Sequence, residues 1–303
     1  MKNNVDWEDR LSEISGIPKP ELSKKHVYIK KSDNSTSGQT KEHRNLHKLF
    51  YKDYFKYVVF QLNGDKVTAQ NKPNNSLLLN ATCEEIPKPE NVNISFPLTV
   101  VYPGLITGVG IDHQANIEGE FKLGVHFDYT YGMPVVYGSS VKGVLSAYFV
   151  DFLETKPSEE ILKKNDILKK LYERIKDEDW KKKDFEDFRI DIFESKNKSI
   201  YNRDIFFDAV IVEANKLDKI LDSDTLCPHG ENPLKNPIPI SFLKIASGVK
   251  MEFRFKLVDS EIGNKKLTAD EKKTIFETIL KTVGVGAKTN VGYGQFTDIK
   301  PEK

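Results

Sequence analysis

Glycines close to lysines are the residues of this sequence with the clearest potential for chemistry. Twelve of the 18 glycines lie in two regions, 104–143 and 284–294. Glycine weakens helices and strands, so it is favoured where the backbone takes left-handed angles or approaches another molecule closely. Each region also carries a lysine, Lys142 in the first and Lys288 in the second. Because backbone amides and an ammonium group together attract phosphate, both regions are candidate anion sites.

The first region ends in a strand that leads into a predicted helix near Gly138. Ser139 and Ser140 are suited to cap this helix, and Lys142 and Gly143 lie in its first turn. The exposed amides and the positive end of the helix dipole attract an anion, and Gly143 leaves room for a ligand backbone. An ordinary capped helix without a ligand is the alternative interpretation.

The second region is a loop after a predicted helix that ends at Gly284. Its lysine, threonine and asparagine are suited to contact phosphate or ribose, and its tyrosine offers a stacking face. The candidate residues are Gly286, Lys288, Thr289, Asn290, Gly292 and Tyr293. The alternative is a glycine at the helix end followed by a glycine-rich entry into a strand.

Neither region matches a common nucleotide-binding loop. A P-loop requires glycine directly before its lysine, but Ala287 precedes Lys288. A G-x-G-x-x-G pattern begins at Gly284, but Thr289 stands where the third glycine belongs. These departures exclude an ATPase and a dinucleotide-binding enzyme.

The histidines and cysteines give little support for catalysis or for a metal centre. Asp112 and His113 are the best pair for metal-independent RNA cleavage, but neighbours on a strand point to opposite faces. We therefore expect His113 to contact RNA, or simply to lie in an exposed loop, without cleaving RNA. Cys83 and Cys227 lack C-x-x-C spacing, which argues against zinc, and so few cysteines fit a reducing cytoplasm. We expect no metal, no cofactor and no enzymatic activity.

The charge balance is close to neutral, with 46 basic and 45 acidic residues. Nucleic-acid binding would therefore depend on a local patch or on an assembly in which other chains supply charge. No run of 18 apolar residues is present, and the start of the sequence does not resemble a secretory signal. We expect a cytoplasmic protein without a membrane-spanning helix.

Hydrophobic periodicity predicts the elements that position these regions. Strands are expected over 57–62, 95–102, 121–129, 204–212, 251–257 and 291–299, and helices over 43–58, 141–153 and 268–283. Several strands follow one another without an intervening helix, which favours an antiparallel α+β sheet. Asn63-Gly64 predicts a hairpin, and Thr268 with Glu271 predicts a capping box. The charged segment 154–197 predicts one or two solvated helices.

Five segments resemble one known family, in the order in which they occur there. Gly138 to Gly143 (GSSVKG) is similar to the G-S-S-[LV]-K-G segment of RAMP proteins, the RNA-binding subunits of CRISPR effector complexes, and 284–296 is similar to their glycine-rich loop. The segments 105–134, 203–211 and 237–248 narrow the resemblance to the sixth subunit of the Cmr (type III-B) complex. Tyr137 stands where that family usually has proline, and Glu194-Ser195 replaces a Phe-Gly type segment.

The resemblance implies a ferredoxin-like, RRM-related α+β fold with an antiparallel sheet. We expect a RAMP domain over 93–303 with a charged helical insertion at 154–198. An N-terminal extension over 1–92 would pack on or beside this core.

The resemblance also implies a non-catalytic subunit that binds the CRISPR RNA backbone near its 3′ end and caps the backbone filament, in antiviral defence. Expected partners are CRISPR RNA, the backbone RAMP subunits and the small subunit, with target RNA contacted indirectly and no membrane. One RNA contact would be lined by Ser139, Ser140, Lys142 and Gly143, and another by Gly286, Lys288, Thr289, Asn290 and Gly292. The alternatives are a RAMP endoribonuclease that processes CRISPR RNA or cuts target RNA, and a scaffold that binds only protein.

Overall fold

A computed structural model gives the fold of the chain and describes most of its residues. The described residues are 45–54, 59–63, 66–70, 72–108, 120–121, 124–195, 198–226 and 239–298. The loosely organised arm before residue 45, the pair Asp112-His113 and the Pro-rich loop around His229 lie outside them.

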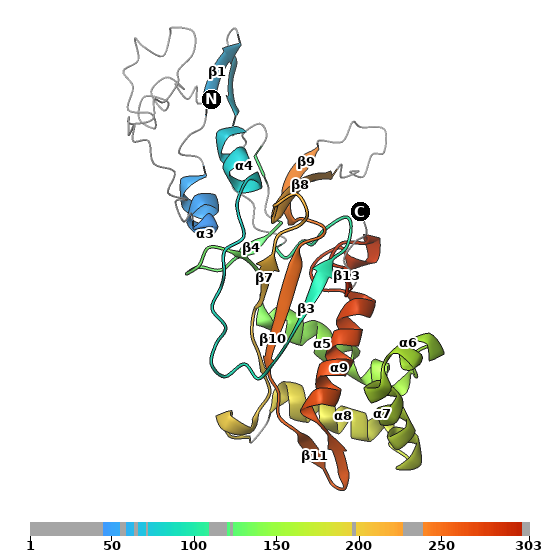
Figure 1. Cartoon of the computed structure of the whole chain (residues 1–303). Helices are drawn as coiled ribbons and strands as arrows, with labels where there is room; N and C mark the ends of the chain where they lie inside the picture. Colours follow the sequence, from blue (N-terminus) through green and yellow to red (C-terminus); the bar gives the residue numbers. More distant parts are fainter. Residues whose placement is uncertain are drawn as a thin grey trace, which may run out of the picture.

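A seven-stranded antiparallel sheet forms the centre of the described structure (Figure 1). The order along the sheet is β13-β3-β10-β7-β5-β4, and β6 also pairs with β10. The strands are β3 (Ile94–Val100), β4 (His126–Phe127), β5 (Pro134–Val136), β6 (Ile205–Phe206), β7 (Ala209–Glu213), β10 (Lys250–Lys256) and β13 (Phe296–Thr297). Each of the pairings among these strands is antiparallel, so the expected sheet type is confirmed.

Two long helices complete a βαββαβ arrangement. Helix α5 (Gly138–Glu154) lies between β3 and β7 in the chain, and α9 (Ala269–Val283) lies between β10 and β13. The corresponding strands are ordered fourth, first, third and second along the sheet, as in a ferredoxin-like fold. The predicted fold class is therefore confirmed. The short hairpin β4–β5 extends this sheet at the β7 edge.

Strand β10 and helix α9 bury their apolar residues against each other. Phe253 and Phe255 of β10 are fully buried, and the Phe255 ring lies 5.7 Å from that of Phe276. The Thr268 hydroxyl accepts from the Glu271 amide while the Glu271 carboxylate accepts from the Thr268 amide. The capping box and the inward helix face are confirmed, because apolar residues at three- and four-residue spacing share one side of a helix.

The charged segment after α5 folds into helices that join the core. They are α6 (Glu159–Lys164), α7 (Asp166–Asp177), α8 (Lys182–Arg189) and the π-helix η2 (Ile190–Glu194). Leu168, Leu171 and Phe188 are fully buried, and the Phe193 ring packs 5.5 Å from Phe149 of α5. The expectation of solvated helices is wrong for the side of these helices that carries the buried apolar residues. Burial of several large apolar side chains stabilises the packed arrangement, although the segment is highly charged.

The elements before β3 are α3 (Leu46–Lys48), the π-helix η1 (Leu49–Asp53), the hairpin β1 (Val59–Asn63) and β2 (Lys66–Gln70), and α4 (Lys72–Leu79). Leu46, Phe50 and Leu78, from α3, η1 and α4, are buried in the same core. Pairing of β1 with β2 confirms the predicted hairpin, whereas the expected single helix is divided into α3 and η1. The buried Tyr54 hydroxyl accepts from the Phe121 amide at 2.7 Å.

Two further hairpins and two 3₁₀ helices complete the described elements. The hairpins are β8 (Leu221–Leu226) with β9 (Ile240–Ile245) and β11 (Ser260–Ile262) with β12 (Lys265–Leu267), and the 3₁₀ helices are η3 (Ile200–Asn202) and η4 (Thr289–Val291). In the described part of the chain, no helix combines the length and the apolar character that crossing a membrane requires.

Two of the predicted strands are shorter than expected. Among the described residues of 121–129 only β4 is a strand, and among those of 291–299 only β13 is. Gly124 lies so close to the Leu243 backbone that a Cβ would meet its carbonyl oxygen at 1.8 Å. Gly292 and Gly294 have φ of 98° and 66°, which ends extended structure before β13 begins.

Candidate nucleic-acid interface

The first glycine cluster lies at the N-terminus of α5, next to the start of β7. The Gly138 amide donates to Asp208 Oδ1 at 2.7 Å. A Cβ on Gly138 would lie 2.3 Å from the Phe206 carbonyl oxygen, so the fold itself requires glycine there. Packing therefore explains the glycine at 138. It does not explain the other residues of the cluster.

The two serines do not cap the helix as the sequence predicted. The N-cap is Tyr137, whose side chain makes no capping hydrogen bond, and the helix begins at Gly138. Ser139 and Ser140 thus lie inside the first turn and are exposed, and the Ser140 amide donates to the Tyr137 carbonyl at 2.8 Å. The serine hydroxyls face solvent beside the positive end of the helix dipole.

Lys142 and Gly143 complete an accessible surface on this first turn. Both residues are exposed, and the Lys142 ammonium lies 6.0 Å from the centre of the Phe206 ring. A Cβ added to Gly143 would meet no atom within 4 Å. The fold gives no packing reason for glycine at 143, and the surface there is open to an approaching backbone.

The local field at this helix terminus is mixed in sign. The Asp208 carboxylate already satisfies the first amide of α5 and offsets part of the helix dipole. Burial raises the pKa of the Tyr137 phenol, and the carboxylates of Asp208 and Asp128 raise it further. A bound phosphate would therefore be held by Lys142 and the serine hydroxyls, away from these carboxylates.

A cleft of about 440 Å³ adjoins this end of α5. Asp128, Tyr131, Asp208 and Arg254 are among its lining residues. The Arg254 guanidinium is largely committed, since it donates to two backbone carbonyls of segment 86–87 at 3.0 and 2.9 Å. Lys88 also lines the cleft, and its ammonium pairs with Glu252 at 2.7 Å. The cleft thus combines two carboxylates with two cations that are already bound to the chain.

The glycines of the second cluster are required by the fold. Gly284, Gly286 and Gly294 have φ of 72°, 97° and 66°. A Cβ on each would lie 2.0 to 2.3 Å from a backbone carbonyl oxygen. The Gly294 amide donates to the Gly104 carbonyl at 2.8 Å. The alternative interpretation of these glycines as packing residues is therefore supported for this loop.

The polar residues of the second cluster are presented by a short 3₁₀ turn. Lys288 precedes η4 with a left-handed φ of 60°, and its carbonyl accepts from the amides of Val291 and Tyr293 at 3.1 and 3.3 Å. Lys288 and Asn290 are exposed, while the Thr289 carbonyl accepts from Gln295 at 3.1 Å. The loop is hydrogen-bonded throughout and directs two polar side chains to solvent.

Tyr293 is not a stacking face, which corrects the prediction from sequence. Its side chain is buried, and its hydroxyl donates to Asp224 Oδ2 of β8 at 2.8 Å. Burial first, and then this hydrogen bond, raise the pKa of Tyr293 to about 12. The exposed aromatic residue beside the loop is Tyr102, at 81% exposure, which the sequence analysis missed.

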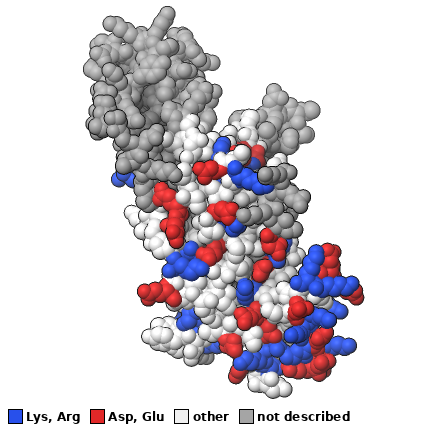
Figure 2. Space-filling model, viewed as in Figure 1, with Lys and Arg blue, Asp and Glu red and all other residues white. Residues whose placement is uncertain are grey.

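The structure does not bring the two clusters together. The first follows β5 and the second precedes β13, and the strand order places β3, β10 and β7 between β5 and β13. His113 lies outside the described residues. Figure 2 shows basic and acidic residues interspersed over the visible face, without a broad field of one sign. In the described residues, no group of three or more potential ligands is placed to hold a metal ion.

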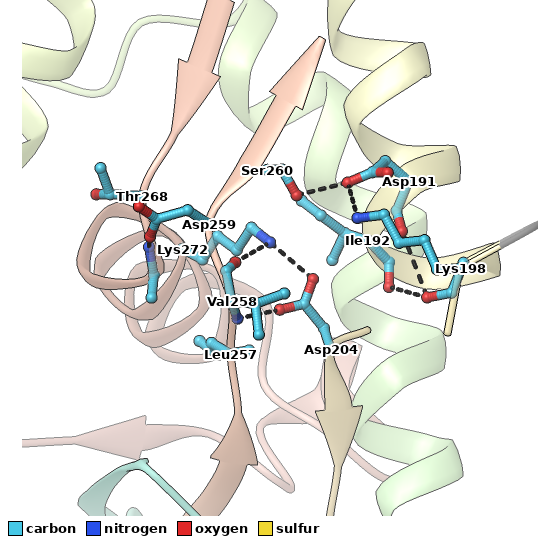
Figure 3. Close-up of polar contacts among 12 residues, drawn as sticks. Asp191, Ile192, Lys198, Asp204, Leu257, Val258, Asp259, Ser260, Thr268 and Lys272 are labelled. Atoms are coloured by element: carbon cyan, nitrogen blue, oxygen red, sulfur yellow. Dashed lines mark hydrogen bonds and ion pairs between the residues drawn. The ribbon is translucent and has the colours of Figure 1, made fainter. Parts of the chain in front are cut away.

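A buried ion pair lies inside the core (Figure 3). Lys272 of α9 donates to Asp204 Oδ2 and to the Val258 carbonyl, both at 2.7 Å, and both charged side chains are fully buried. Burial lowers the pKa of Lys272, and Asp204 opposes this shift. Nearby, Ser260 donates to Asp191 of η2 at 2.5 Å. This network joins α9, the end of β10 and η2, and it is not accessible to RNA.

Comparison with known proteins identifies the class to which this fold and these glycine-rich segments belong. The family model described as the RAMP superfamily matches residues 97–297 of the 303. The chain therefore belongs to the RAMP superfamily. The comparison with curated proteins found no match.

Two solved structures are similar in fold. One is a chain of the cryo-EM structure of the type III-B Cmr-beta bound to cognate target RNA, at 20% identity and TM-score 0.42, covering 67% of this chain and 56% of that one. The other is the crystal structure of Cmr6 from Pyrococcus furiosus, at 23% identity and TM-score 0.37, covering 68% of this chain and 97% of that one.

Proposed function

We propose that this chain is a non-catalytic, RNA-binding subunit of a type III-B (Cmr) CRISPR effector complex. In this role it binds the CRISPR RNA backbone near the 3′ end and caps the filament of backbone subunits. Membership of the RAMP superfamily supports the proposal at the level of the family. The observation that carries the RNA contact is the open surface at Gly143, beside the exposed Lys142 and the exposed serines.

The first turn of α5 has the chemistry of a phosphate contact. A glycine without a packing role lets a sugar-phosphate chain approach the helix backbone. Ser139 and Ser140 donate hydroxyl hydrogen bonds, and Lys142 supplies a full positive charge. Such contacts fix the register of an RNA strand and read no base, which suits a subunit that holds guides of many sequences.

The loop after α9 supplies the second contact, with fewer side chains available for RNA than the sequence suggested. Its glycines shape the loop, and the side chains that remain for RNA are Lys288 and Asn290, with Thr289 at partial exposure. Tyr102 adds an exposed ring at the same surface. The loop is already ordered by its own hydrogen bonds, so little conformational entropy is lost on binding.

Two of the acidic residues that would be considered for hydrolysis are engaged in holding the fold. Asp204 bonds Lys272 and the Val258 amide, and Asp208 bonds the Gly138 amide. These bonds support a binding role over an endoribonuclease role for the described surface. Cleavage of repeat RNA by the full chain, abolished in His113→Ala, would overturn the non-catalytic assignment.

Replacing both exposed lysines tests the proposal. In the double variant Lys142→Ala/Lys288→Ala of the full chain, we expect weaker retention of CRISPR repeat RNA, irrespective of its sequence. The slope of log affinity against log salt should fall by about one for each phosphate contact removed. Filter binding over a salt series measures both quantities.

Lys170→Ala is the matched control, because Lys170 is an exposed lysine on α7, away from both clusters. It should leave affinity and salt slope unchanged. Unchanged RNA retention in the double variant would refute the site assignment. Purification of the tagged chain from its own cells should recover short RNAs with a common 5′ segment and several partner subunits, and a chain recovered without RNA or partners would refute the assembly.

A further inference from the structure

A cluster of exposed and half-buried aromatic rings lies beside the first turn of α5. Its members come from α3, η1, the β4 region and the N-cap of α5, and the sequence analysis did not single them out for stacking. They are His47, Tyr51, His126, Tyr129 and Tyr137, here called the aromatic cluster.

One half of the aromatic cluster is a stacked pair. The rings of His126 and Tyr137 are 4.6 Å apart with an interplanar angle of 20°. Tyr137 is 37% exposed, and it is the residue directly before Gly138. Burial lowers the pKa of His126, which favours the neutral imidazole in this stack. One face of a parallel aromatic pair is thereby held next to the serines of α5.

The other half is built on η1 and the turn after β4. The His47 ring lies 4.6 Å from that of Tyr51 and 5.0 Å from that of Tyr129. Tyr51 also packs edge-on to the buried Phe127, at 6.5 Å, which supports it from below. Tyr129 is 79% exposed, and Tyr51 is 38% exposed.

The two halves are held in one place by backbone contacts. Asn45 donates to the carbonyls of Tyr129 and Thr130, both at 3.1 Å, and the Leu46 amide donates to the Gly132 carbonyl at 3.1 Å. Tyr51 packs on Phe127, which directly follows His126 in β4, so the two halves meet at this strand. The cluster is therefore a pre-positioned surface formed by segments far apart in sequence.

We propose that the aromatic cluster is a stacking platform for nucleobases of single-stranded RNA whose adjoining phosphate lies at the first turn of α5. This inference rests on the RNA-binding function proposed above. Tyr137 lies only two residues before Ser139, so a base on its ring and a phosphate at Ser139 and Lys142 are compatible with one nucleotide. Flat tyrosine and histidine faces bind bases of any sequence, as a subunit that holds varied guides requires.

The composition of the surface favours a base over a protein partner. The exposed rings of the cluster are those of Tyr51, Tyr129 and Tyr137, which carry hydroxyls at their edges, and the two histidines are half-buried. Strongly exposed aliphatic side chains of the described structure, such as Leu217 at 77% and Ile200 at 59%, lie on other segments. A protein interface core would be expected to combine aromatic with aliphatic side chains in one desolvated patch.

Fluorescent RNA tests the platform directly. The full chain is titrated with a single-stranded RNA that carries 2-aminopurine, and with an abasic RNA of the same length. Stacking should quench 2-aminopurine and make the base-bearing RNA bind more tightly than the abasic one. In Tyr51→Leu/Tyr137→Leu we expect the quenching to be lost and the affinity for base-bearing RNA to fall roughly tenfold, with abasic binding unchanged.

Two control variants separate stacking from folding. Tyr51→Phe/Tyr137→Phe keeps both rings and should keep quenching and affinity. Tyr148→Leu removes a tyrosine of α5 that is 45% exposed and lies outside the aromatic cluster. This variant should also bind RNA like the unmodified chain. Thermal melting of each variant checks that the fold is intact.

The outcomes also separate this inference from the function on which it rests. Equal affinity of the unmodified chain for base-bearing and abasic RNA, with loss of both in Lys142→Ala, overturns the platform and leaves RNA binding in place. Loss of base-bearing and abasic binding to the same extent in the leucine variant overturns the platform as well. Absence of binding to either RNA by the unmodified chain, and by the effector complex that contains it, overturns both proposals.

Discussion

Gly143 and Gly294 show how the same residue type serves two different purposes. A Cβ at Gly294 would lie 2.0 Å from the Val285 carbonyl oxygen, and its φ is 66°, so a side chain there strains the loop. At Gly143 the helix conformation is ordinary and a Cβ has open space. Helix propensity alone disfavours glycine at 143 by roughly 0.5–1 kcal/mol relative to alanine. The proposed RNA contact would explain its presence there, because an approaching RNA backbone needs the space.

Substitutions at Gly143 should therefore separate stability from RNA binding. We expect Gly143→Ala to raise the free energy of unfolding by roughly 0.5–1 kcal/mol, because alanine is the better helix former. Gly143→Leu should fold normally and lose RNA affinity, since its side chain fills the approach to α5. Urea unfolding and RNA titration of the same preparations measure the two effects.

Gly294→Ala provides the comparison, with an expected loss of about 1 kcal/mol or more from the strained φ. Normal RNA affinity in Gly143→Leu would mean that no RNA backbone approaches this turn, and destabilisation by Gly143→Ala would mean that the glycine is structural after all.

The residues of the candidate site were predictable to different degrees. The exposed positions of Lys142, Lys288 and Asn290 agree with the sequence prediction, because lysine and asparagine side chains are rarely buried. Tyrosine is amphipathic, and sequence alone does not decide its burial. Tyr293 was expected outside and is buried, whereas Tyr137 carries an exposed ring that no local pattern indicated.

At the scale of elements, the helices after α5 show that charge density is a poor guide to burial. The segment is rich in lysine, aspartate and glutamate, yet its aromatic residues are covered. The rings of Trp180 and Phe188 stack at 5.1 Å, and Phe188 is fully buried. Helix α8 packs on α5, so the element that carries the candidate site is supported by the charged segment.

Phe188→Ala should destabilise the whole described core and not only the charged helices. Removing a fully buried phenylalanine leaves a cavity, with an expected cost of about 3–5 kcal/mol in the free energy of unfolding. Because α8 and α5 share one core, circular dichroism and tryptophan fluorescence should report one shifted transition. A separate early transition confined to tryptophan fluorescence would show that these helices fold independently.

Element boundaries were predicted best where the apolar period is long and uninterrupted. The predicted boundaries of helix α9 and strand β10 agree with the observed ones to within one residue, because each element carries a regular apolar face and α9 begins with a capping box. The expected strand over 121–129 was too long. It was predicted from alternating apolar and polar residues alone, which do not show the close contact of Gly124 with the Leu243 backbone. Such contacts between distant segments are not visible in a local pattern.

At the scale of the whole molecule, the residue patterns predicted an antiparallel α+β sheet, but the order of its strands was expected only from the family resemblance. That order depends on pairings such as β3 with β10 and β13 with β3, which join residues far apart in the chain. The order places four strand spacings between β5 and β13. At about 4.8 Å per spacing, the two candidate RNA contacts lie roughly 19 Å apart across the sheet.

This separation predicts that the two lysine contacts act independently. Side chains more than about 10 Å apart with no shared partner usually contribute additively, within about 0.5 kcal/mol. A double-mutant cycle with Lys142→Ala, Lys288→Ala and the double variant should therefore give a coupling energy below that value for a long RNA. With a dinucleotide, too short to span both contacts, at most one of the two substitutions should weaken binding. Strong coupling, or equal sensitivity of the dinucleotide to both substitutions, would mean that both lysines hold the same phosphate, which the strand order does not allow.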